Sequence, residues 1–526
     1  MAVQDGRGAR LRRAASSRTG FAALAAALYL VAGLLATWPA IEHLRTHFLA
    51  ERASSVGEAA PGDHLQTGWN LWLFGHQLEH ANAFWHDSYS FRPELSPRVN
   101  FQGLVFGLPY WPLFAVFGAV LAWNLFTLLA YVGAGGATCA WLRSLGLPRG
   151  AALVGGLAFA LAPYRVGQST GHLLGPISLF LPLSLFALEK RRPFLAGAAI
   201  AAIPLSGQVS LAVGAVPFFV AYAFVRGRGW LDAVPGTVFA VAAAGLVHYY
   251  AIRGSLHEHG RSLAEVGRYS AEWVGFVSRH GSGETFVFLG WLTPLLALVG
   301  LALLLRDRRY ALAALLVAAV VVPVVIALGT HLPTYSLARH VVPGLKVARV
   351  PERLLPLACL AVAALVAFAF ARARPWLVAL ALVLVAVDLH VRLYHAARAD
   401  EGNAAYAALR DAHPGRLLEL PVFLPDVQLN STYLYYDMAA QRQRPAGYST
   451  TVPRPAFRTA RRLQPLTCGT WSRDVARLGI RYVAVHDGFY ESFYPRCLER
   501  AQAALRGHGF RLLARDGQVK VWTNRP

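Results

Sequence analysis

The chain has 526 residues, of which 56% are hydrophobic and only 15% are charged, and its mean hydropathy is +0.41. A soluble domain is roughly a quarter charged, so this composition excludes an ordinary soluble protein. The formal net charge of +22 would suit a nucleic-acid-binding protein. The basic residues, however, are spread between apolar segments instead of gathering on one face, so nucleic acid is excluded as a partner. The composition indicates an integral membrane protein.

Twelve apolar segments approach the length that crosses a bilayer, and we predict them as membrane spans. The first follows the basic residues 1–20, which are expected in the cytoplasm, and it is too long for the core of a cleaved signal peptide. Basic residues recur in short loops between later spans, which places those loops inside and the C-terminus outside. The predicted spans are 21–41, 104–120, 122–142, 150–165, 173–188, 193–206, 209–225, 233–251, 286–305, 310–329, 353–371 and 375–394.

This count conflicts with the predicted topology, because an even number of crossings would return the C-terminus to the inside. Either the segment 102–121, which contains Pro109 and Pro112, is re-entrant, or another span is miscounted. A re-entrant backbone is tolerated only where protein or water covers it, so it would line the site. The sequence leaves both alternatives open and predicts about 11 to 13 spans.

The predicted fold is mainly α: a polytopic transmembrane helical bundle with a small extracytoplasmic α/β domain at the C-terminus. Hydropathy falls sharply after Ala396. The predicted parts are a cytoplasmic N-terminus (1–20), a transmembrane domain (21–398) with a large first outside loop (42–102), and the C-terminal domain (399–526).

Within the C-terminal domain, 417–422 and 481–486 have the apolar pattern of buried strands. Asp516-Gly517 stands between two apolar runs, which predicts a tight hairpin. Cys468 and Cys497 lie in this domain, and an oxidising compartment would favour a disulfide between them. The alternative is two unrelated buried thiols.

The first outside loop contains Pro61-Gly62-Asp63-His64, followed by an aromatic run from Trp69 to Phe74. Tryptophan favours the membrane–water interface, so this run predicts a short helix lying on the bilayer surface. A carboxylate at the rim of a membrane cavity can accept a proton from a hydroxyl group, which makes Asp63 the candidate catalytic base. The alternative is that Asp63 only caps the helix that follows it.

The order of these parts resembles the GT-C superfamily of glycosyltransferases. The resemblance continues at Ala162-Pro163-Tyr164-Arg165 and Arg268-Tyr269-Ser270, and is clearest at Arg349-Val350-Pro351-Glu352-Arg353. It implies a sugar donor linked to polyprenyl phosphate, with Asp63 as the base or the acid that orients the acceptor. Many members have two adjacent acids here, whereas this chain has Asp63-His64. That departure speaks against a metal-assisted mechanism, and no cofactor is predicted.

A donor phosphate needs cations, and the planar fork of arginine can hold two phosphate oxygens at once. Arg349 and Arg353 are the leading candidates, with Lys346 and Arg165 behind them. An arginine at a membrane mouth is costly unless it is paired or functional. The alternative is pairing with Glu352 or with lipid headgroups.

Other polar residues face outside in this topology. His64, His172 and Glu284 are candidates for orienting the acceptor, although each alone is more often a solvated or capping group. His257-Glu258-His259 is a poor match to known metal-ligand spacing, so no metal is predicted. Tyrosines of the C-terminal domain are candidate sugar contacts: Tyr433, Tyr435, Tyr436 and Tyr448.

The sequence thus predicts a membrane glycosyltransferase, transferring a hexose or pentose with inversion. Its donor would be a polyprenyl-phosphate sugar, and its acceptor an extracytoplasmic glycan, lipid or protein. The arginine-rich, lysine-poor composition is typical of a GC-rich bacterial genome. Together with the apolar spans, it predicts a multi-pass protein of the bacterial plasma membrane, in contact with membrane lipids. The alternative is a non-catalytic flippase or carrier of lipid-linked glycans, or a cell-envelope assembly factor on the same scaffold. No internal repeat typical of transporters is evident, which favours the enzyme.

Overall fold

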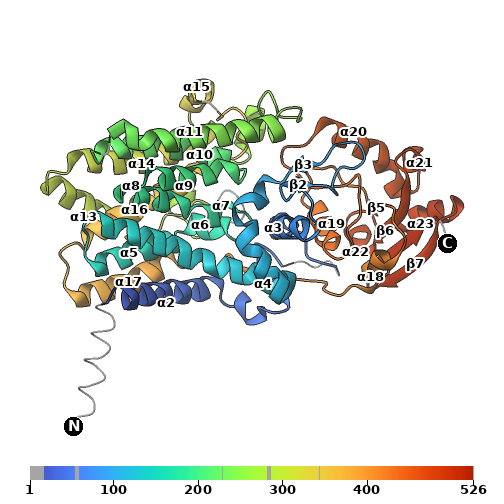
Figure 1. Ribbon diagram of the computed structural model, residues 1–526, viewed down its shortest axis with the longest axis horizontal. Helices are drawn as coiled ribbons and strands as arrows, with labels where there is room; N and C mark the ends of the chain where they lie inside the picture. The colour runs from blue at the N-terminus through green and yellow to red at the C-terminus, as the bar shows by residue number, and fades with distance from the viewer. Residues whose placement is uncertain (1–16, 54–57, 228, 281–285, 343, 525–526) are drawn as a thin grey trace, which may run out of the picture. The chain divides into compact units, whose positions relative to one another are not determined.

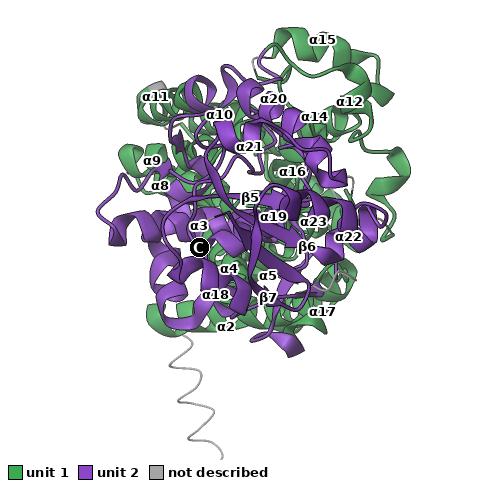
Figure 2. Cartoon of the chain, turned by 90° about the vertical axis from the view of Figure 1, so that its right-hand side faces the viewer, with its two compact units in different colours: residues 1–41, 125–246, 259–394 green, residues 42–124, 247–258, 395–526 purple. Residues whose placement is uncertain are grey.

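The computed structural model describes residues 17–53, 58–227, 229–280, 286–342 and 344–524. They form two compact units, coloured separately in Figure 2. We call the first the bundle unit, because its described residues are mainly helical, and the second the mixed unit, because it contains the strands. The bundle unit comprises residues 1–41, 125–246 and 259–394, and the mixed unit comprises residues 42–124, 247–258 and 395–526.

Helix α16 (Leu355–Ala369) lies at the centre of the bundle unit (Figure 1). Its residues from Leu355 to Phe368 are all buried, and it packs against α5, α13 and α14. The close approach of α13 requires Gly300, because a Cβ there would lie 1.8 Å from the carbonyl oxygen of Leu365. The helices mainly of this unit are α2 (Arg18–Thr37), α5 (Arg149–Ala160), α6 (Pro163–Gln168), α7 (Leu174–Ile177), α8 (Phe180–Glu189), α9 (Pro193–Leu205), α10 (Val209–Val225), α11 (Gly229–Val247), α12 (Leu263–Gly267), α13 (Leu292–Arg306), α14 (Tyr310–Ala327), α15 (Thr334–Val341), α16 and α17 (Pro375–Leu389), with the short turns η3 (Trp273–Phe276), η5 (Gly329–His331) and η6 (Pro351–Leu354).

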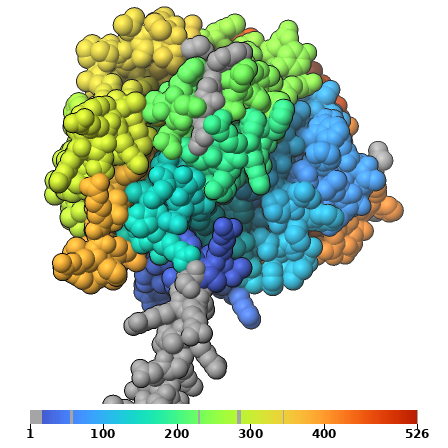
Figure 3. Space-filling view, turned by 60° about the vertical axis from the view of Figure 1, so that its left-hand side comes forward, coloured from blue at the N-terminus to red at the C-terminus, as the bar shows by residue number. Residues whose placement is uncertain are grey.

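The outer helices of the bundle unit expose large apolar side chains. Leu298 on α13 is 61% exposed, and Trp376 and Val383 on α17 are each 60% exposed. These helices form part of the yellow-green and orange surface at the left of Figure 3. Soluble proteins rarely expose so much contiguous apolar surface to water, whereas in a membrane such a surface contacts apolar lipid tails. In the described chain, five helices are long and apolar enough to cross a membrane, and six apolar helices are shorter, eleven together.

The predicted spans 104–120 and 122–142 both lie in α4 (Phe101–Ser144), which consists of two helices that meet at a kink at Gly118. Gly118 has a φ of 74° and a ψ of −179°, a conformation that glycine adopts far more readily than other residues. Pro109 and Pro112 lie in the helical part before Gly118, and the re-entrant alternative for 102–121 stays a prediction. If the two parts of α4 together cross the membrane once, eleven predicted spans remain, an odd number that agrees with the predicted N-inside, C-outside topology.

The first part of α4 packs on α3 (Asp63–Glu79) within the mixed unit. Two glycines allow the close approach: a Cβ at Gly107 would lie 2.4 Å from the side chain of Phe74, and one at Gly75 would lie 2.4 Å from Trp111. Because higher numbers on one helix meet higher numbers on the other, the two helices run in the same direction. The N-terminal part of α4 therefore supports α3.

A four-stranded sheet organises the C-terminal part of the mixed unit, in the order β5-β6-β8-β7. Strands β5 and β6 are parallel, and the other pairs are antiparallel. Leu418, Val483 and Trp522 belong to a buried core on this sheet. The predicted strands and the predicted hairpin at Asp516-Gly517 are confirmed. The strands are β1 (His47–Ala50), β2 (His86–Asp87), β3 (Arg98–Val99), β4 (His395–Arg398), β5 (Arg416–Leu420), β6 (Ile480–His486), β7 (Arg511–Asp516) and β8 (Val519–Thr523), and the helices and turns are η1 (Ala40–His43), α3, η2 (His248–Ile252), α18 (Ala404–Asp411), α19 (Asn430–Asp437), α20 (Arg454–Leu463), η7 (Gln464–Cys468), α21 (Asp474–Arg477), α22 (Asp487–Phe493) and α23 (Leu498–Gly507).

The predicted first outside loop belongs to the same unit as the C-terminal residues. Strand β1, just after the first helix, pairs antiparallel with β4, so that His47 lies opposite Arg398. Cys468 and Cys497 form a disulfide, which joins η7 to the residue preceding α23. Segments nearly 350 residues apart in the chain, 47–50 and 395–398, are thus held by one two-stranded ladder.

Candidate active site

Asp63 is the first residue of α3, and it is partly buried. Its Oδ1 accepts a hydrogen bond of 2.9 Å from the hydroxyl group of Tyr448. The N-cap position belongs to Gly62, and Asp63 stands in the first turn of the helix. A carboxylate in the first turn of a helix is favoured by the partial positive charge of that helix end.

Helix α3 does not lie on a surface as predicted. Its residues from His64 to Gln77 are all buried, and α19 and the first part of α4 pack against it. The indole nitrogen of Trp69 donates a 3.0 Å hydrogen bond to Oδ2 of Asp437 on α19. The aromatic run therefore packs inside the protein, and the sequence pattern of an interfacial helix was misleading.

His64, predicted to help orient the acceptor, is 2% exposed. Burial lowers its pKa from the ordinary 6.5 to about 3, so the imidazole is neutral at physiological pH. Its ring packs 5.2 Å from that of Phe48. A Cβ at Gly62 would lie 2.5 Å from Nδ1 of His64, so glycine is required before Asp63. The geometry gives His64 a packing role beside the candidate base.

The segment 430–449 of the C-terminal part contacts the start of α3. The backbone N–H of Gly62 donates to Oγ of Ser431 at 3.0 Å, and Nε2 of Gln66 donates to the carbonyl oxygen of Tyr448 at 3.0 Å. Together with the hydroxyl of Tyr448, these contacts fix the backbone on both sides of Asp63. Tyr448 is half-buried. The other predicted sugar-contacting tyrosines are buried and contribute to packing instead: Tyr433, Tyr435 and Tyr436.

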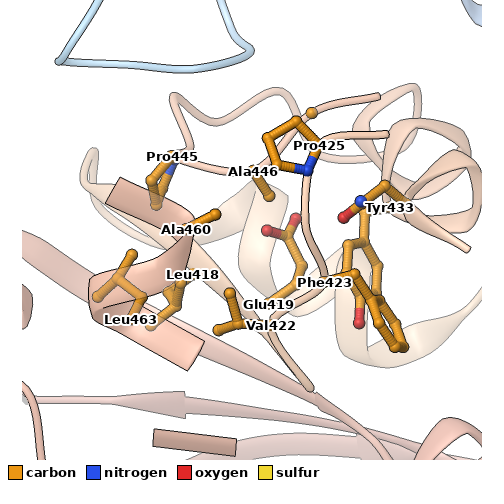
Figure 4. A pocket seen from close by; sticks show the side chains of 12 residues that line it. Leu418, Glu419, Val422, Phe423, Pro425, Tyr433, Pro445, Ala446, Ala460 and Leu463 are labelled. Carbon is orange, nitrogen blue, oxygen red and sulfur yellow. The ribbon is translucent and has the colours of Figure 1, made fainter. Parts of the chain in front are cut away.

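A fully buried cluster of one arginine and two carboxylates anchors this segment. Arg444 forms ion pairs with Glu419 and Asp437, and the side chains of all three residues are 0% exposed. Nη1 of Arg444 also donates to the carbonyl oxygen of Tyr433 at 2.8 Å. Figure 4 shows Glu419 pointing into a cavity of about 10 Å³, enough for about one water molecule. Oε2 of Glu419 has no hydrogen-bond partner among the described residues.

The stability of the mixed unit is expected to fall as pH rises from about 4.5 to about 7. Burial raises the pKa of Glu419 from 4.5 to about 7 and that of Asp437 from 3.8 to about 6. A carboxyl group with a raised pKa keeps its proton in the folded state at a pH where the unfolded chain has lost it. This contribution is fully present below the unfolded-state pKa and disappears as pH rises through the folded-state pKa.

Thermal unfolding followed by tryptophan fluorescence across this pH range measures the effect. Glu419→Gln should flatten the dependence, because glutamine does not titrate. An unfolding temperature that rises with pH in the wild type, or an unchanged slope in the variant, would contradict the assignment.

In the bundle unit, three arginines lie near one another: Arg261 just before α12, Arg349 just before η6 and Arg353 within η6. Arg261 is 7% exposed, and its carboxylate partner is Glu265. Burial lowers the pKa of Arg261, Glu265 opposes this shift, and the nearby charges of Arg349 and Arg353 add to it. The guanidinium carbon of Arg349 lies 4.7 Å from the ring centroid of Tyr269. We call Arg261, Arg349 and Arg353 the arginine cluster.

Sequence reasoning missed Arg261, although it found the other two members. The loop that contains Arg261 has no recognisable motif, and only the fold brings Arg261 close to Arg349 and Arg353. Lys346, also predicted, is exposed; its carbonyl oxygen accepts a 3.1 Å hydrogen bond from the backbone N–H of Arg261.

Arg165 does not suit the predicted role of a phosphate ligand. It is fully buried, and its guanidinium donates to Oγ of Ser178 and to the carbonyl oxygens of Ala160 and Ala130 at 2.7 to 3.1 Å. These contacts hold the interior of the bundle unit together. His172 lies half-buried between α6 and α7, and the predicted Glu284 lies outside the described residues.

The chain resembles known proteins in its three-dimensional structure but not in its sequence. No protein-family model matches the chain, and no curated protein matches its sequence. The structure of the arabinofuranosyltransferase AftD from Mycobacteria aligns over 97% of this chain, with a TM-score of 0.59 and 15% sequence identity. The structure of an AftD mutant also aligns over 97% of this chain, with a TM-score of 0.55 and 16% identity. ArnT from Cupriavidus metallidurans, bound to undecaprenyl phosphate, aligns over 97% of this chain and 99% of its own with a TM-score of 0.41 and 14% identity.

The chain has a GT-C-like fold. It spans about 40% of the length of AftD, because the two AftD structures are covered over 40% and 42% of their chains. The fold predicted from the order of the segments is thereby confirmed. In this GT-C-like fold, Asp63 lies in the mixed unit and the arginine cluster lies in the bundle unit.

Proposed function

We propose that the protein is a membrane glycosyltransferase that transfers a sugar from a polyprenyl-phosphate donor to the hydroxyl group of an extracytoplasmic acceptor. The observation that carries this proposal is the pair Asp63–Tyr448 at the start of α3, in a chain with a GT-C-like fold. In this proposal the protein lies in a bacterial plasma membrane, with its N-terminus in the cytoplasm and its C-terminal part outside. Because AftD is an arabinofuranosyltransferase, a polyprenyl-phosphate pentose is the first donor to test.

Asp63 acts as the general base. Its carboxylate takes the proton of the acceptor hydroxyl while the oxygen attacks the anomeric carbon of the donor sugar. The bond between that carbon and the phosphate oxygen breaks, and the phosphate leaves with the electron pair. Direct displacement inverts the anomeric configuration. The hydrogen bond from Tyr448 orients the carboxylate, and the buried anchor at Arg444 keeps Tyr448 in place.

Within the bundle unit, the arginine cluster is the proposed binding site for the phosphate of the polyprenyl lipid. Three guanidinium groups near one another repel, and Glu265 pairs with Arg261 by an i,i+4 contact. A bound phosphate would accept charge-assisted hydrogen bonds from these guanidinium groups. Arg349, stacked on Tyr269, presents its planar fork in a fixed orientation.

Arg349→Gln and Arg353→Gln should each weaken binding of a polyprenyl phosphate about 10- to 150-fold, because a charge-assisted hydrogen bond contributes about 1.5–3 kcal/mol. The measurement is titration of the purified protein in nanodiscs with a polyprenyl phosphate. Arg268→Gln is the matched control, since Arg268 is an exposed arginine of the same outside segment.

The control should bind as the wild type does. If all three variants bind the polyprenyl phosphate with the same affinity, the arginine cluster is not the phosphate site. Initial rates with a polyprenyl-phosphate pentose test the activity itself: binding without any transfer to added acceptors would favour a carrier over an enzyme.

A further inference from the structure

A group of two histidines and a glutamate lies at the other end of α3 from Asp63. His76, Glu79 and His80 each offer one ligand atom, and these atoms lie within 4.8 Å of one another. The three occupy positions i, i+3 and i+4, so they share one face of the helix end. Two histidines one turn apart on a helix form a pair that holds zinc in helical metal sites. The sequence patterns predicted no metal site.

Each of the three side chains has a second polar contact that orients it. Nε2 of His76 lies 2.8 Å from the hydroxyl oxygen of Tyr89, and Nδ1 of His80 lies 2.8 Å from the carbonyl oxygen of His76. The indole nitrogen of Trp111 donates to Oε1 of Glu79 at 2.6 Å. Metal-bound histidines and carboxylates almost always have such partners on their remaining polar atoms, because these fix the ring tautomer and the direction of the ligand.

The surroundings hold the ligands in one arrangement. The ring of Trp72 stacks on that of His76 at 4.5 Å, and the rings of His76 and His80 are 4.2 Å apart. His76 is buried, whereas Glu79 and His80 are exposed, so an ion can enter from solvent. Around a tetrahedral zinc ion with bonds of about 2.1 Å, ligand atoms are about 3.4 Å apart. Small side-chain rotations bring atoms already within 4.8 Å to that distance.

We infer that His76, Glu79 and His80 form a binding site for a divalent transition metal of the zinc class. Two imidazoles and one carboxylate give three ligands, and water completes the coordination. His76 stands 13 residues after Asp63 on the same helix, about 20 Å along its axis. The ion is therefore remote from the proposed base. It fixes the C-terminal end of α3 against Tyr89 and Trp111, and the inference does not depend on the proposed transfer reaction.

The test uses full-length protein without a histidine tag, in nanodiscs, stripped with a chelator and dialysed. Zn²⁺ is titrated with detection by tryptophan fluorescence, since Trp72 and Trp111 contact the site, and Co²⁺ absorption reports the coordination. We expect one equivalent of Zn²⁺ to bind. His80→Ala and Glu79→Gln should each weaken binding at least tenfold. Both positions are exposed, and unfolding temperatures measured in chelator verify that the variants fold.

His43→Ala is the matched control. His43 and His47 are also four residues apart, with ring centroids at 5.2 Å, and the control should leave zinc affinity unchanged. Trp111→Phe removes only the indole donor to Glu79 and should weaken binding less than Glu79→Gln does. Either of two results would overturn the inference: no stoichiometric zinc binding by the wild type, or wild-type affinity in both His80→Ala and Glu79→Gln.

Discussion

Asp63→Asn should lower the rate of sugar transfer by about 10²- to 10⁴-fold, the usual contribution of a general base. Asparagine has nearly the same shape and can still accept the hydrogen bond from Tyr448, but it cannot take up the acceptor's proton. The fold should therefore persist while the chemistry is lost. The measurement is the initial rate with a polyprenyl-phosphate sugar, together with the thermal unfolding temperature.

Two companion variants sharpen this test. Asp426→Asn changes an exposed carboxylate of the same unit and should leave the rate unchanged. Tyr448→Phe removes the 2.9 Å hydrogen bond to Asp63 and should lower kcat about tenfold, with the KM for the donor unchanged. If Asp63→Asn keeps a rate within threefold of the wild type, Asp63 is not the base.

Arg444→Met should destabilise the mixed unit by about 3–5 kcal/mol. Arg444 is fully buried between Glu419 and Asp437, and its removal leaves two buried carboxyl groups without their cation. Both would have to remain protonated or draw in water. Denaturant unfolding of the purified protein, followed by tryptophan fluorescence, measures the loss. Because Arg444 anchors the segment that carries Tyr448, transfer activity should decline as well.

Arg462→Met is the matched control for this loss of an arginine. Its ion pair with Asp474 is 2.7 Å long, but the arginine side chain is 48% exposed, so the expected cost is below about 1 kcal/mol. Adding Glu419→Gln to Arg444→Met should restore part of the stability, because it removes one of the uncompensated carboxylates. Equal losses in the buried and the exposed variants would refute the role of the buried cluster.

Local patterns in the sequence were sufficient for much of the fold. The apolar runs predicted the helices of the bundle, and Asp516-Gly517 predicted the hairpin of β7 and β8. These signals are local, because hydrophobic length and turn chemistry are written in consecutive residues. Segment 104–120 is as apolar as a membrane span, and in the structure it also packs on α3. Hydropathy cannot distinguish burial in protein from burial in lipid.

For the candidate site, the sequence could name residues but not their partners. It pointed to Asp63 because of the loop in which that residue lies, and to Arg349 because of a family resemblance. It could not pair Asp63 with Tyr448, 385 positions away, nor bring Arg261 to Arg349. Such pairings depend on contacts between distant segments, to which local patterns are blind. The same reason explains the error over Arg165, an outside candidate by sequence that is buried in the structure.

The sequence by itself determined that this is a membrane protein with a basic N-terminus, many apolar helices and a C-terminal α/β region. Composition and hydropathy are sufficient for this assignment, because they determine whether a segment is more stable in lipid or in water. Only the tertiary structure decided that α3 is buried from His64 to Gln77, so that the first turn of the helix holds a partly exposed Asp63 on a rigid support. It also decided that His76, Glu79 and His80 are oriented by Tyr89 and Trp111. Burial and side-chain direction result from packing between segments distant in sequence, and packing exists only in three dimensions.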